Sequence, residues 1–418
     1  MQPKFSVFVK YGSNRDLSKL EISSLLERIK PKAFSFQEWK DNLLLTLSEN
    51  EKGQFLKYLE NTGSIVKAGS LEIEENIQKE KYWKSDFKKL VEDTLQKNYK
   101  HSKRQVKISI SIQSTSKELT TNIHRAIQEI IRNASNDLDI PIKLLKLKNE
   151  TYEQTPFQYH KENMNKRGFE ITGFVIKSKI FLGITRWVTN PLMDIKQDEG
   201  RKVRFFTHGT SIKLARSLVF LSQIQKGEIL LDPFCGTGTI LLQGLKIGVD
   251  VIGVDNDPKC FRATKENLNQ FSLQHPAKAR IKDKWKVFKL DSRNLSPILP
   301  NKVGTIVTEP YLGPFLTELP DEDEAENIMS ELENLYTSVL RTSKNFLKPN
   351  SKVVMVIPEY QYDNDLVVSP DIERIAQDSS MKLEKESAFF SIEIPVAIGR
   401  EHNVIGRKLA IFYKDTNN

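Results

Sequence analysis

The sequence has little cysteine. Only Cys235 and Cys260 occur among its 418 residues, beside six histidines. Two cysteines are too few for a disulfide framework, and neither stands in the Cys/His spacing of a zinc site. We expect both to be buried packing residues, and we expect the protein to hold no metal.

Long hydrophobic runs are also absent. No apolar stretch reaches the roughly 18 to 20 residues that cross a bilayer, and the N-terminal MQPKFSVFVKYG lacks the apolar centre and the cleavage site of a signal peptide. We therefore expect a cytoplasmic protein with no membrane partner. Positive charge is plentiful: 63 Lys and Arg against 54 Asp and Glu give a net charge of +9. Such an excess suits a polyanionic partner, although lysine also serves solubility.

The pattern of the chain changes near residue 202. Before it, short strands and amphipathic helices form two α+β stretches, with a turn expected at 59–73 and a strand hairpin at 169–190. A polar linker follows the hairpin. After residue 202, nearly continuous apolar strands alternate with helices, which predicts a parallel, doubly wound sheet.

A glycine turn follows the first of these strands. In LLDPFCGTGTI the strand ends at Asp232, and Gly236 and Gly238 open the next helix. Glycine lets a ligand approach the backbone, and the free N–H groups of the helix then point at that ligand. Asp255 and Asp291 end the second and third strands in the same manner, so we expect three carboxylates in one nucleoside crevice, with Asp255 accepting from both ribose hydroxyls.

Two cofactors could use such a crevice. NAD is one, but the turn reads D-P-F-C-G-T-G and not G-x-G-x-x-G, so no pyrophosphate is clearly cradled. S-adenosylmethionine has no phosphate and fits the turn better. Four neighbouring residues also belong to the predicted cofactor site: Pro233, Phe234, Asn256 and Ser292.

The turn resembles the cofactor motif of class I methyltransferases that modify RNA bases. Upstream of it, KVRFFTHGTSIKLARSLVFLSQ resembles the block that precedes this motif in THUMP-containing tRNA guanine-N2 methyltransferases. In that family an H-x-G-[ST]-[SL] segment passes near the methionine end of the cofactor. The resemblance therefore implies that His208, Gly209, Thr210 and Ser211 lie near the site.

The resemblance continues, more weakly, in other stretches. LENTGSIVKAG, TPFQYHKENMNKRGFEI, FLGITRWVTNPLMDIKQDEGRKVR and GREHNVIGRKLAIF are similar to family blocks on either side of the cofactor motif. The resemblance implies a class I Rossmann-like methyltransferase domain at 202–418. It also implies an N-terminal ferredoxin-like domain at 1–60, a THUMP domain at 61–185 and a linker at 186–201. Its expected partners are tRNA and, by likeness to the eukaryotic members, an activating protein subunit.

The segment VTEPYLG stands at the tip of the fourth strand of this domain, where family members carry D-P-P-Y or N-P-P-Y. Two registers are open: Thr308 replaces the Asp, or Glu309 does so and Pro310 keeps its place. We favour the second, which keeps a carboxylate at the strand tip. Glu309 and the Pro310 carbonyl are then expected to accept hydrogen bonds from the target amine, while Tyr311 stacks on the base.

Two basic stretches in the N-terminal half, Lys97 to Lys107 and Lys143 to Lys148, are candidates for contacts with RNA phosphates. The favoured function is S-adenosylmethionine-dependent methylation of the N2 amine of a guanine in tRNA, at position 10 by family analogy. Two alternatives stay open: a DNA adenine amino-methyltransferase, and an RNA-binding module with a vestigial methyltransferase domain.

Overall fold

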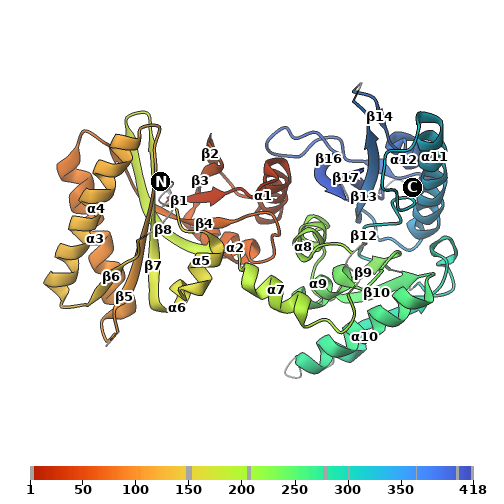
Figure 1. The fold of residues 1–418 in the computed structure, drawn as a ribbon, viewed down its shortest axis with the longest axis horizontal. Coiled ribbons are helices and arrows are strands. Elements are labelled where there is room, and N and C mark those ends of the chain that lie inside the picture. Colours follow the sequence, from red (N-terminus) through yellow and green to blue (C-terminus); the bar gives the residue numbers. More distant parts are fainter. Residues whose placement is uncertain are drawn as a thin grey trace. The chain divides into compact units, whose positions relative to one another are not determined.

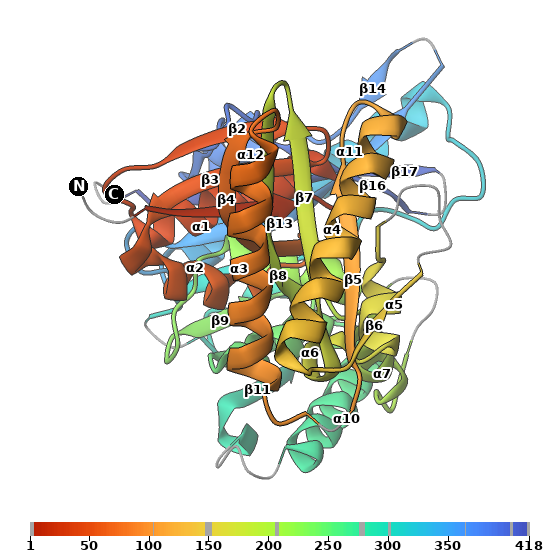
Figure 2. The same cartoon turned by 90° about the vertical axis from the view of Figure 1, so that its left-hand side faces the viewer.

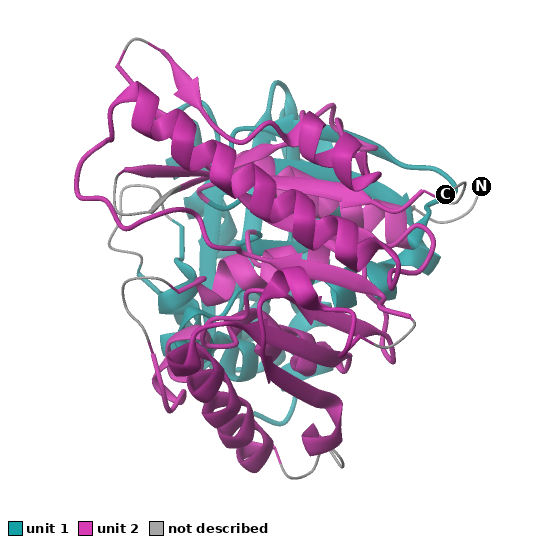
Figure 3. Cartoon of the chain, turned by 90° about the vertical axis from the view of Figure 1, so that its right-hand side faces the viewer, with its two compact units in different colours: residues 1–12, 29–60, 65–193 teal, residues 13–28, 61–64, 194–418 magenta. Residues whose placement is uncertain are grey.

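The computed structural model describes residues 4–102, 104–146, 153–204, 209–275, 281–299, 302–363, 365–401 and 404–415. The chain forms two compact units, coloured separately in Figure 3. Unit 1 comprises residues 1–12, 29–60 and 65–193, and unit 2 comprises residues 13–28, 61–64 and 194–418. No helix among the described residues is both long and apolar enough to cross a membrane.

Unit 1 is built on one eight-stranded sheet in the order β2-β3-β1-β4-β8-β7-β5-β6. The strands are β1 (Lys4–Lys10), β2 (Ser35–Trp39), β3 (Asn42–Ser48), β4 (Lys67–Asn76), β5 (Val106–Gln113), β6 (Ile142–Leu144), β7 (Gly168–Ile176) and β8 (Lys179–Val188). The helices are α2 (Lys52–Leu59), α3 (Glu80–Tyr99), α4 (Lys117–Leu138), α5 (Pro156–Lys161) and α6 (Met164–Arg167).

Two helices, α3 and α4, lie side by side on this sheet (Figure 2). Trp83, Phe87, Val91 and Leu95 recur every four residues along α3, and isoleucines of α4 recur at the same spacing, so each helix buries one stripe. Alternate residues of β5 complete this core. The predicted amphipathic helices of this half of the chain and the predicted hairpin at 169–190, formed by β7 and β8, are confirmed.

The stretch 59–73, expected to be a turn, is only partly one. The strand β4 begins at Lys67 and pairs with both β1 and β8, so it joins the strands on either side of residue 60 into one sheet. Similarly, the expected linker 186–201 holds the end of β8 and the helix α7 (Pro191–Glu199). The division into ferredoxin-like and THUMP domains remains a prediction.

Unit 2 has a nine-stranded sheet with the main order β11-β10-β9-β12-β13-β17-β15. Its strands are β9 (Ile229–Asp232), β10 (Asp250–Asp255), β11 (Trp285–Lys289), β12 (Thr305–Thr308), β13 (Lys352–Gln361), β14 (Val367–Val368), β15 (Lys382–Leu383), β16 (Val396–Glu401) and β17 (Ile405–Tyr413). Its helices are α1 (Arg15–Ile29, of which Ile29 is counted with unit 1), α8 (Ile212–Leu221), α9 (Thr239–Ile247), α10 (Pro258–Gln274), α11 (Glu322–Lys344) and α12 (Ile372–Ser379).

The sheet of unit 2 separates two hydrophobic cores. One contains residues of α1, α8, α9 and α10, and the other contains residues of α11 and α12, which pack together (Figure 1). Strands β9 to β13 pair in parallel, which confirms the predicted doubly wound sheet, and β17 adds to β13 antiparallel. Strand β9 lies between β10 and β12, so the strand order reverses direction at β9. Such a reversal is called a topological switch point.

Helix α1 belongs to unit 2, although it lies in the first 30 residues of the chain. Its Leu17 and Leu20 are part of the core that contains α8 and α9. Its buried Glu21 accepts hydrogen bonds from the backbone N–H groups of Gly63, at 2.7 Å, and Ser64, at 3.0 Å. A Cβ atom at Gly63 would stand 2.1 Å from the carbonyl oxygen of Lys213, so only glycine allows this approach. Two N-terminal segments are therefore structural parts of the C-terminal unit.

Candidate active site

The glycine turn between β9 and α9 is held in place by backbone hydrogen bonds. The Cys235 N–H donates to the Val254 carbonyl at 2.9 Å, and the Gly236 N–H donates to Oδ2 of Asp255 at 2.9 Å. Gly236 and Gly238 have φ angles of 52° and 84°, which L side chains rarely adopt. Apart from its two chain neighbours, no described residue has an atom within 4 Å of the position that a Cβ of Gly236 would take, so the turn leaves space there.

A pocket of about 340 Å³ lies beside this turn, at the carboxyl ends of β9, β10 and β12. Four stretches of unit 2 line it: residues 209–210 before α8, the turn with the start of α9, the end of β10 with Cys260, and the loop 309–316 after β12. Val404 and Ile405, at the start of β17, complete the lining. The pocket therefore occupies the switch point where ligands bind in open α/β sheets.

Asp232 is the most buried carboxylate of this pocket. Its Oδ1 accepts hydrogen bonds from the Thr308 hydroxyl, at 2.8 Å, and from the Phe234 N–H, at 3.2 Å. Burial raises the pKa of Asp232 to about 7, with smaller upward contributions from the charges of Asp255 and Glu309 and with the two hydrogen bonds acting in the opposite direction. The Asp232–Thr308 bond joins the tip of β9 to the tip of β12.

Asp255 ends β10 and faces the same pocket. It accepts from the Gly236 N–H through Oδ2 and from the Asp257 N–H through Oδ1, each at 2.9 Å. A carboxylate has about four acceptor positions, so it can take further hydrogen bonds from a ligand. Partial burial raises the pKa of Asp255, and the two N–H groups oppose that change.

Glu309 follows β12 and forms an ion pair with Arg407 of β17. Arg407 donates through Nη1 to Oε1 of Glu309 at 2.9 Å, and the Glu309 side chain is only 8% exposed. The second carboxylate oxygen, Oε2, is buried and has no hydrogen-bond partner among the residues that the structure describes. An unpaired buried carboxylate oxygen is costly, so its position at a pocket wall suggests a ligand that donates a hydrogen bond.

Thr308, the last residue of β12, is buried, and its hydroxyl donates to Asp232. Its side chain therefore already connects two strands. The choice between the two registers of this segment remains a prediction. Pro310 and Tyr311 follow in the pocket wall.

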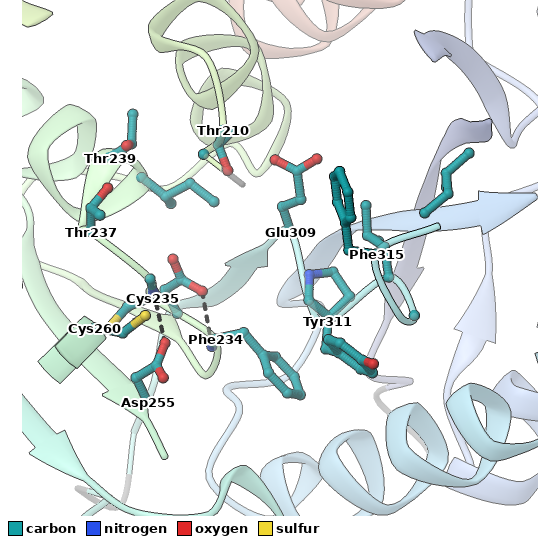
Figure 4. A pocket seen from close by; sticks show the side chains of 18 of the residues that line it. Thr210, Phe234, Cys235, Thr237, Thr239, Asp255, Cys260, Glu309, Tyr311 and Phe315 are labelled. Atoms are coloured by element: carbon teal, nitrogen blue, oxygen red, sulfur yellow. Dashed lines mark hydrogen bonds between the residues drawn. The ribbon is translucent and has the colours of Figure 1, made fainter. Parts of the chain in front are cut away.

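Three aromatic residues border the pocket. Tyr311 and Phe315 are about half exposed, at 54% and 55%, and Phe234 is partly buried. In Figure 4 the carboxylate of Glu309 points to the side of Thr210 and Phe315, whereas the rings of Tyr311 and Phe234 lie on the opposite side. The Tyr311 carbonyl accepts from the hydroxyl of buried Tyr336 at 2.6 Å, which anchors the loop. Phe315 is thus a second half-exposed aromatic side chain in the pocket lining.

Six predicted cofactor residues line the pocket: Thr210, Asp232, Phe234, Gly236, Asp255 and Asn256. Five others are absent from its described lining: Ser211, Pro233, Gly238, Asp291 and Ser292. The contacts that these five residues make instead explain why they lie outside the pocket.

Ser211 caps α8 by accepting from the Leu214 N–H, and Gly238 is the first residue before α9. The Ser292 hydroxyl donates to the Pro233 carbonyl, so both residues support the turn from behind. Asp291 caps the short helix that follows β11 and pairs with Arg293 at 2.5 Å, which holds the pKa of Asp291 below its usual range. The expected convergence of three acids is therefore seen for two of them.

Sequence reasoning missed several parts of the site. Thr237, Thr239 and Cys260 line the pocket beside the turn, and Arg407 stands behind Glu309. Cys260 is half-buried, whereas Cys235 is buried as expected. Arg407 belongs to a stretch that resembled the family, but no local pattern pointed to Glu309, 98 residues away. His208, expected near the site, lies outside the described residues.

Within the described ranges, no group of three or more His, Cys, Asp and Glu side chains is arranged to hold a metal ion.

Two family models match the chain. One, described as "RMKL-like, methyltransferase domain", matches residues 201–378, which include the glycine turn, Asp255 and the Glu309 loop. The other, described as "DNA methylase", matches residues 67–266. Both matches contain the turn and the first two strands of the unit 2 sheet.

Curated relatives match a shorter part of the chain. The tRNA (guanine(10)-N2)-dimethyltransferase of Methanothermobacter thermautotrophicus is 33% identical over 156 residues, covering 37% of this chain and 40% of that protein. The protein of the same name from Methanocaldococcus jannaschii is 34% identical over 134 residues, covering 31% and 35%. A probable tRNA (guanine(10)-N2)-dimethyltransferase of Methanothermococcus thermolithotrophicus is 39% identical over 102 residues, covering 24% and 60%. The matched stretch thus spans less than two thirds of each relative.

One solved structure shares the fold along almost the whole chain. TrmN from Thermus thermophilus aligns with a TM-score of 0.50 over 98% of this chain and 99% of that one, at 14% identity. Together with the family model, this similarity shows that unit 2 has the class I methyltransferase fold.

Proposed function

We propose that this protein is an S-adenosylmethionine-dependent tRNA methyltransferase that acts on the N2 amine of a guanine, at position 10. The observation that carries the proposal is the buried, unpaired Oε2 of Glu309 beside the glycine turn. The relatives named as tRNA (guanine(10)-N2)-dimethyltransferases support the substrate, and the methyltransferase-domain match supports the reaction class.

The pocket fits S-adenosylmethionine. Asp255 offers free acceptor capacity for ribose hydroxyls, and the open space at Gly236 allows a ligand to approach the turn. Partly apolar walls from Phe234 and Ile240 suit an uncharged adenine ring. When bound, the cofactor supplies an electrophilic methyl group.

The loop that carries Glu309 would bind the target amine. The exocyclic nitrogen of guanine is a weak nucleophile because its lone pair is delocalised into the ring. Glu309 Oε2 accepts one amine hydrogen and the Pro310 carbonyl accepts the other, while Tyr311 or Phe315 stacks on the base. Proline fixes its φ angle, so these acceptors are preorganised. Positioning and charge placement then supply most of the rate acceleration.

Unit 1 offers a basic surface for the tRNA backbone. An open pocket of about 550 Å³ there is lined by Tyr99, His101, Ser102, Arg104, Gln105, Asn163, Lys166 and Arg167. Tyr99 itself is not available for stacking, because its ring packs against Phe169 and its hydroxyl donates to the Gly168 carbonyl at 2.7 Å. The cationic side chains around it are suited to phosphate contacts, which give affinity without sequence readout.

The proposal is tested by transfer of a tritiated methyl group from labelled S-adenosylmethionine to bulk tRNA, with calorimetry for cofactor binding. We expect binding and transfer, with the label in N2-methylated guanosine. Cofactor binding without any transfer would instead favour an RNA-binding module with a vestigial methyltransferase domain.

A second candidate is methylation of the adenine amine in DNA, which the DNA methylase match at 67–266 favours. The same acceptor pair serves either amine, so the loop alone does not separate the two substrates. Transfer to duplex DNA but not to tRNA, measured in the same assay, would support this candidate and reject the first.

A further inference from the structure

We propose that Arg407 is a positioning residue of the reaction: it holds the Glu309 carboxylate by Oε1 so that Oε2 alone faces the target amine. This inference rests on the proposed function. Its structural basis is the Arg407–Glu309 ion pair, formed between residues 98 positions apart at the wall of the pocket.

The sheet explains why these two side chains meet. Val307 pairs with Val354, and Val354 pairs with Ile411, so β13 lies between β12 and β17. Side chains alternate along a strand, and Val307 and Ile411 face the same core. Glu309 and Arg407 are two and four residues away from these positions, on the same face.

The distance across β13 accounts for the length of both side chains. Neighbouring strands are about 5 Å apart, so the backbones of β12 and β17 are separated by roughly 10 Å. Arginine reaches most of this distance, and glutamate carries one methylene more than the aspartate of the family motif. Glu309 is therefore long enough to reach Arg407, and a shorter carboxylate would reach it less well.

The charges around the site explain how the Glu309–Arg407 pair contributes. Glu309 is 8% exposed, and its charge acts on the buried Asp232 in the same pocket. A carboxylate in such surroundings is destabilised by desolvation and by like charge, and a guanidinium at 2.9 Å offsets both effects. Arg407 thereby compensates the charge of the Glu309 carboxylate and fixes its Oε1.

A fixed acceptor also selects the substrate. A carboxylate oxygen such as Oε2 gains a hydrogen bond from an N–H donor but is repelled by a carbonyl oxygen in the same position. The pair thus favours the amine edge of a base over an oxo edge. Arg407 holds Glu309 through Oε1, and Oε2 has no hydrogen-bond partner among the described residues, so a lysine can replace part of this contact.

The test is steady-state methylation of tRNA by the full-length protein carrying Arg407→Met, Arg407→Lys, Glu309→Ala or the Arg407→Met/Glu309→Ala pair. Lys408→Met is the matched control: Lys408 is the next residue of β17 and also pairs with a carboxylate, Glu359, at 2.6 Å, but neither lines the pocket. Melting temperature and cofactor affinity by calorimetry are measured for each variant.

We expect Arg407→Met to lower kcat by about 10- to 100-fold, with the KM for tRNA and the cofactor affinity nearly unchanged. Arg407→Lys should recover part of the loss, the double variant should be no slower than Glu309→Ala, and Lys408→Met should match the wild type. Full kcat in Arg407→Met, or independent losses that multiply in the double variant, would overturn the inference while leaving the proposed function intact. If the wild type transfers no methyl group to tRNA, the proposed function fails and the inference with it.

Discussion

The two walls of the pocket are built in different ways. The glycine turn wall is local: its shape comes from backbone conformation, and all its parts stand between Asp232 and Asp257. The Glu309 wall is assembled across the sheet, because its carboxylate depends on an arginine two strands away. The first wall is suited to hold a ligand by its backbone, and the second to act on one through a charged side chain. The Asp232–Thr308 hydrogen bond connects them.

Removal of the Glu309 carboxylate should have the largest effect. We expect Glu309→Ala to lower kcat for tRNA by roughly 100- to 1,000-fold, because it removes an acceptor that acts as charge develops on the amine. Cofactor affinity by calorimetry should stay within a few-fold of the wild type. Equal losses in kcat and cofactor binding would show that the two walls do not have separate tasks.

Asp232 connects the walls and should make stability depend on pH. Its pKa is raised from the ordinary value of 3.8 to about 7, so the folded state binds a proton more tightly than the unfolded chain. The stabilisation is complete below about pH 4 and is lost as pH rises to about 7, with an expected change of a few kcal/mol at about 1.4 kcal/mol per pKa unit.

The free energy of unfolding, measured in denaturant from pH 5 to pH 8, checks this. Asp232→Asn keeps an oxygen for the Thr308 hydroxyl and the Phe234 N–H but cannot ionise. The wild type should lose stability relative to this variant as pH rises. A constant difference between the two would contradict the assigned cause.

The glycine turn should respond to a single methyl group. Gly238 has a φ of 84°, and a Cβ there would stand 3.0 Å from Cγ2 of Thr264. We expect Gly238→Ala to lower the free energy of unfolding by about 1 to 2 kcal/mol and to weaken cofactor binding. Gly53→Ala is the control: it lies in helix α2, where, apart from its two chain neighbours, no other side chain of the described residues comes within 4 Å of the new Cβ, and it should be neutral or stabilising. Equal losses in both variants would speak against a special role of the turn.

The basic pocket of unit 1 belongs to neither wall and should give the smallest effect per residue. Lys166→Ala and Arg167→Ala should each raise the KM for tRNA a few-fold and leave kcat and cofactor affinity unchanged. The increase in KM should diminish at higher salt, because both the wild type and the variants then bind weakly. A change in kcat would mean that these residues reach the reacting base.

The local wall could be predicted from the sequence. The strand ends at Asp232 and Asp255 and the glycines between them lie in one short stretch, so their convergence follows from a single strand-turn-helix-strand pattern. Asp291 shows the limit of this reasoning: it also ends a strand region, but Arg293 and the cap of the next short helix occupy its carboxylate.

The second wall and the unit boundaries could not be predicted in full. Glu309 and Arg407 meet only through the order of β12, β13 and β17, and no sequence pattern specifies that order residue by residue. Helix α1 likewise reads as part of an N-terminal unit, whereas its leucines and Glu21 pack into unit 2. The THUMP assignment, the activating subunit and the position-10 target remain predictions.

Mass spectrometry of tRNA nucleosides tests the central claim most directly. The protein is incubated with tRNA and S-adenosylmethionine carrying a deuterated methyl group, with Glu309→Ala in parallel. The account predicts deuterated N2-methylguanosine with the wild type and only a trace with the variant. Label in another nucleoside, or equal labelling by both proteins, would contradict it.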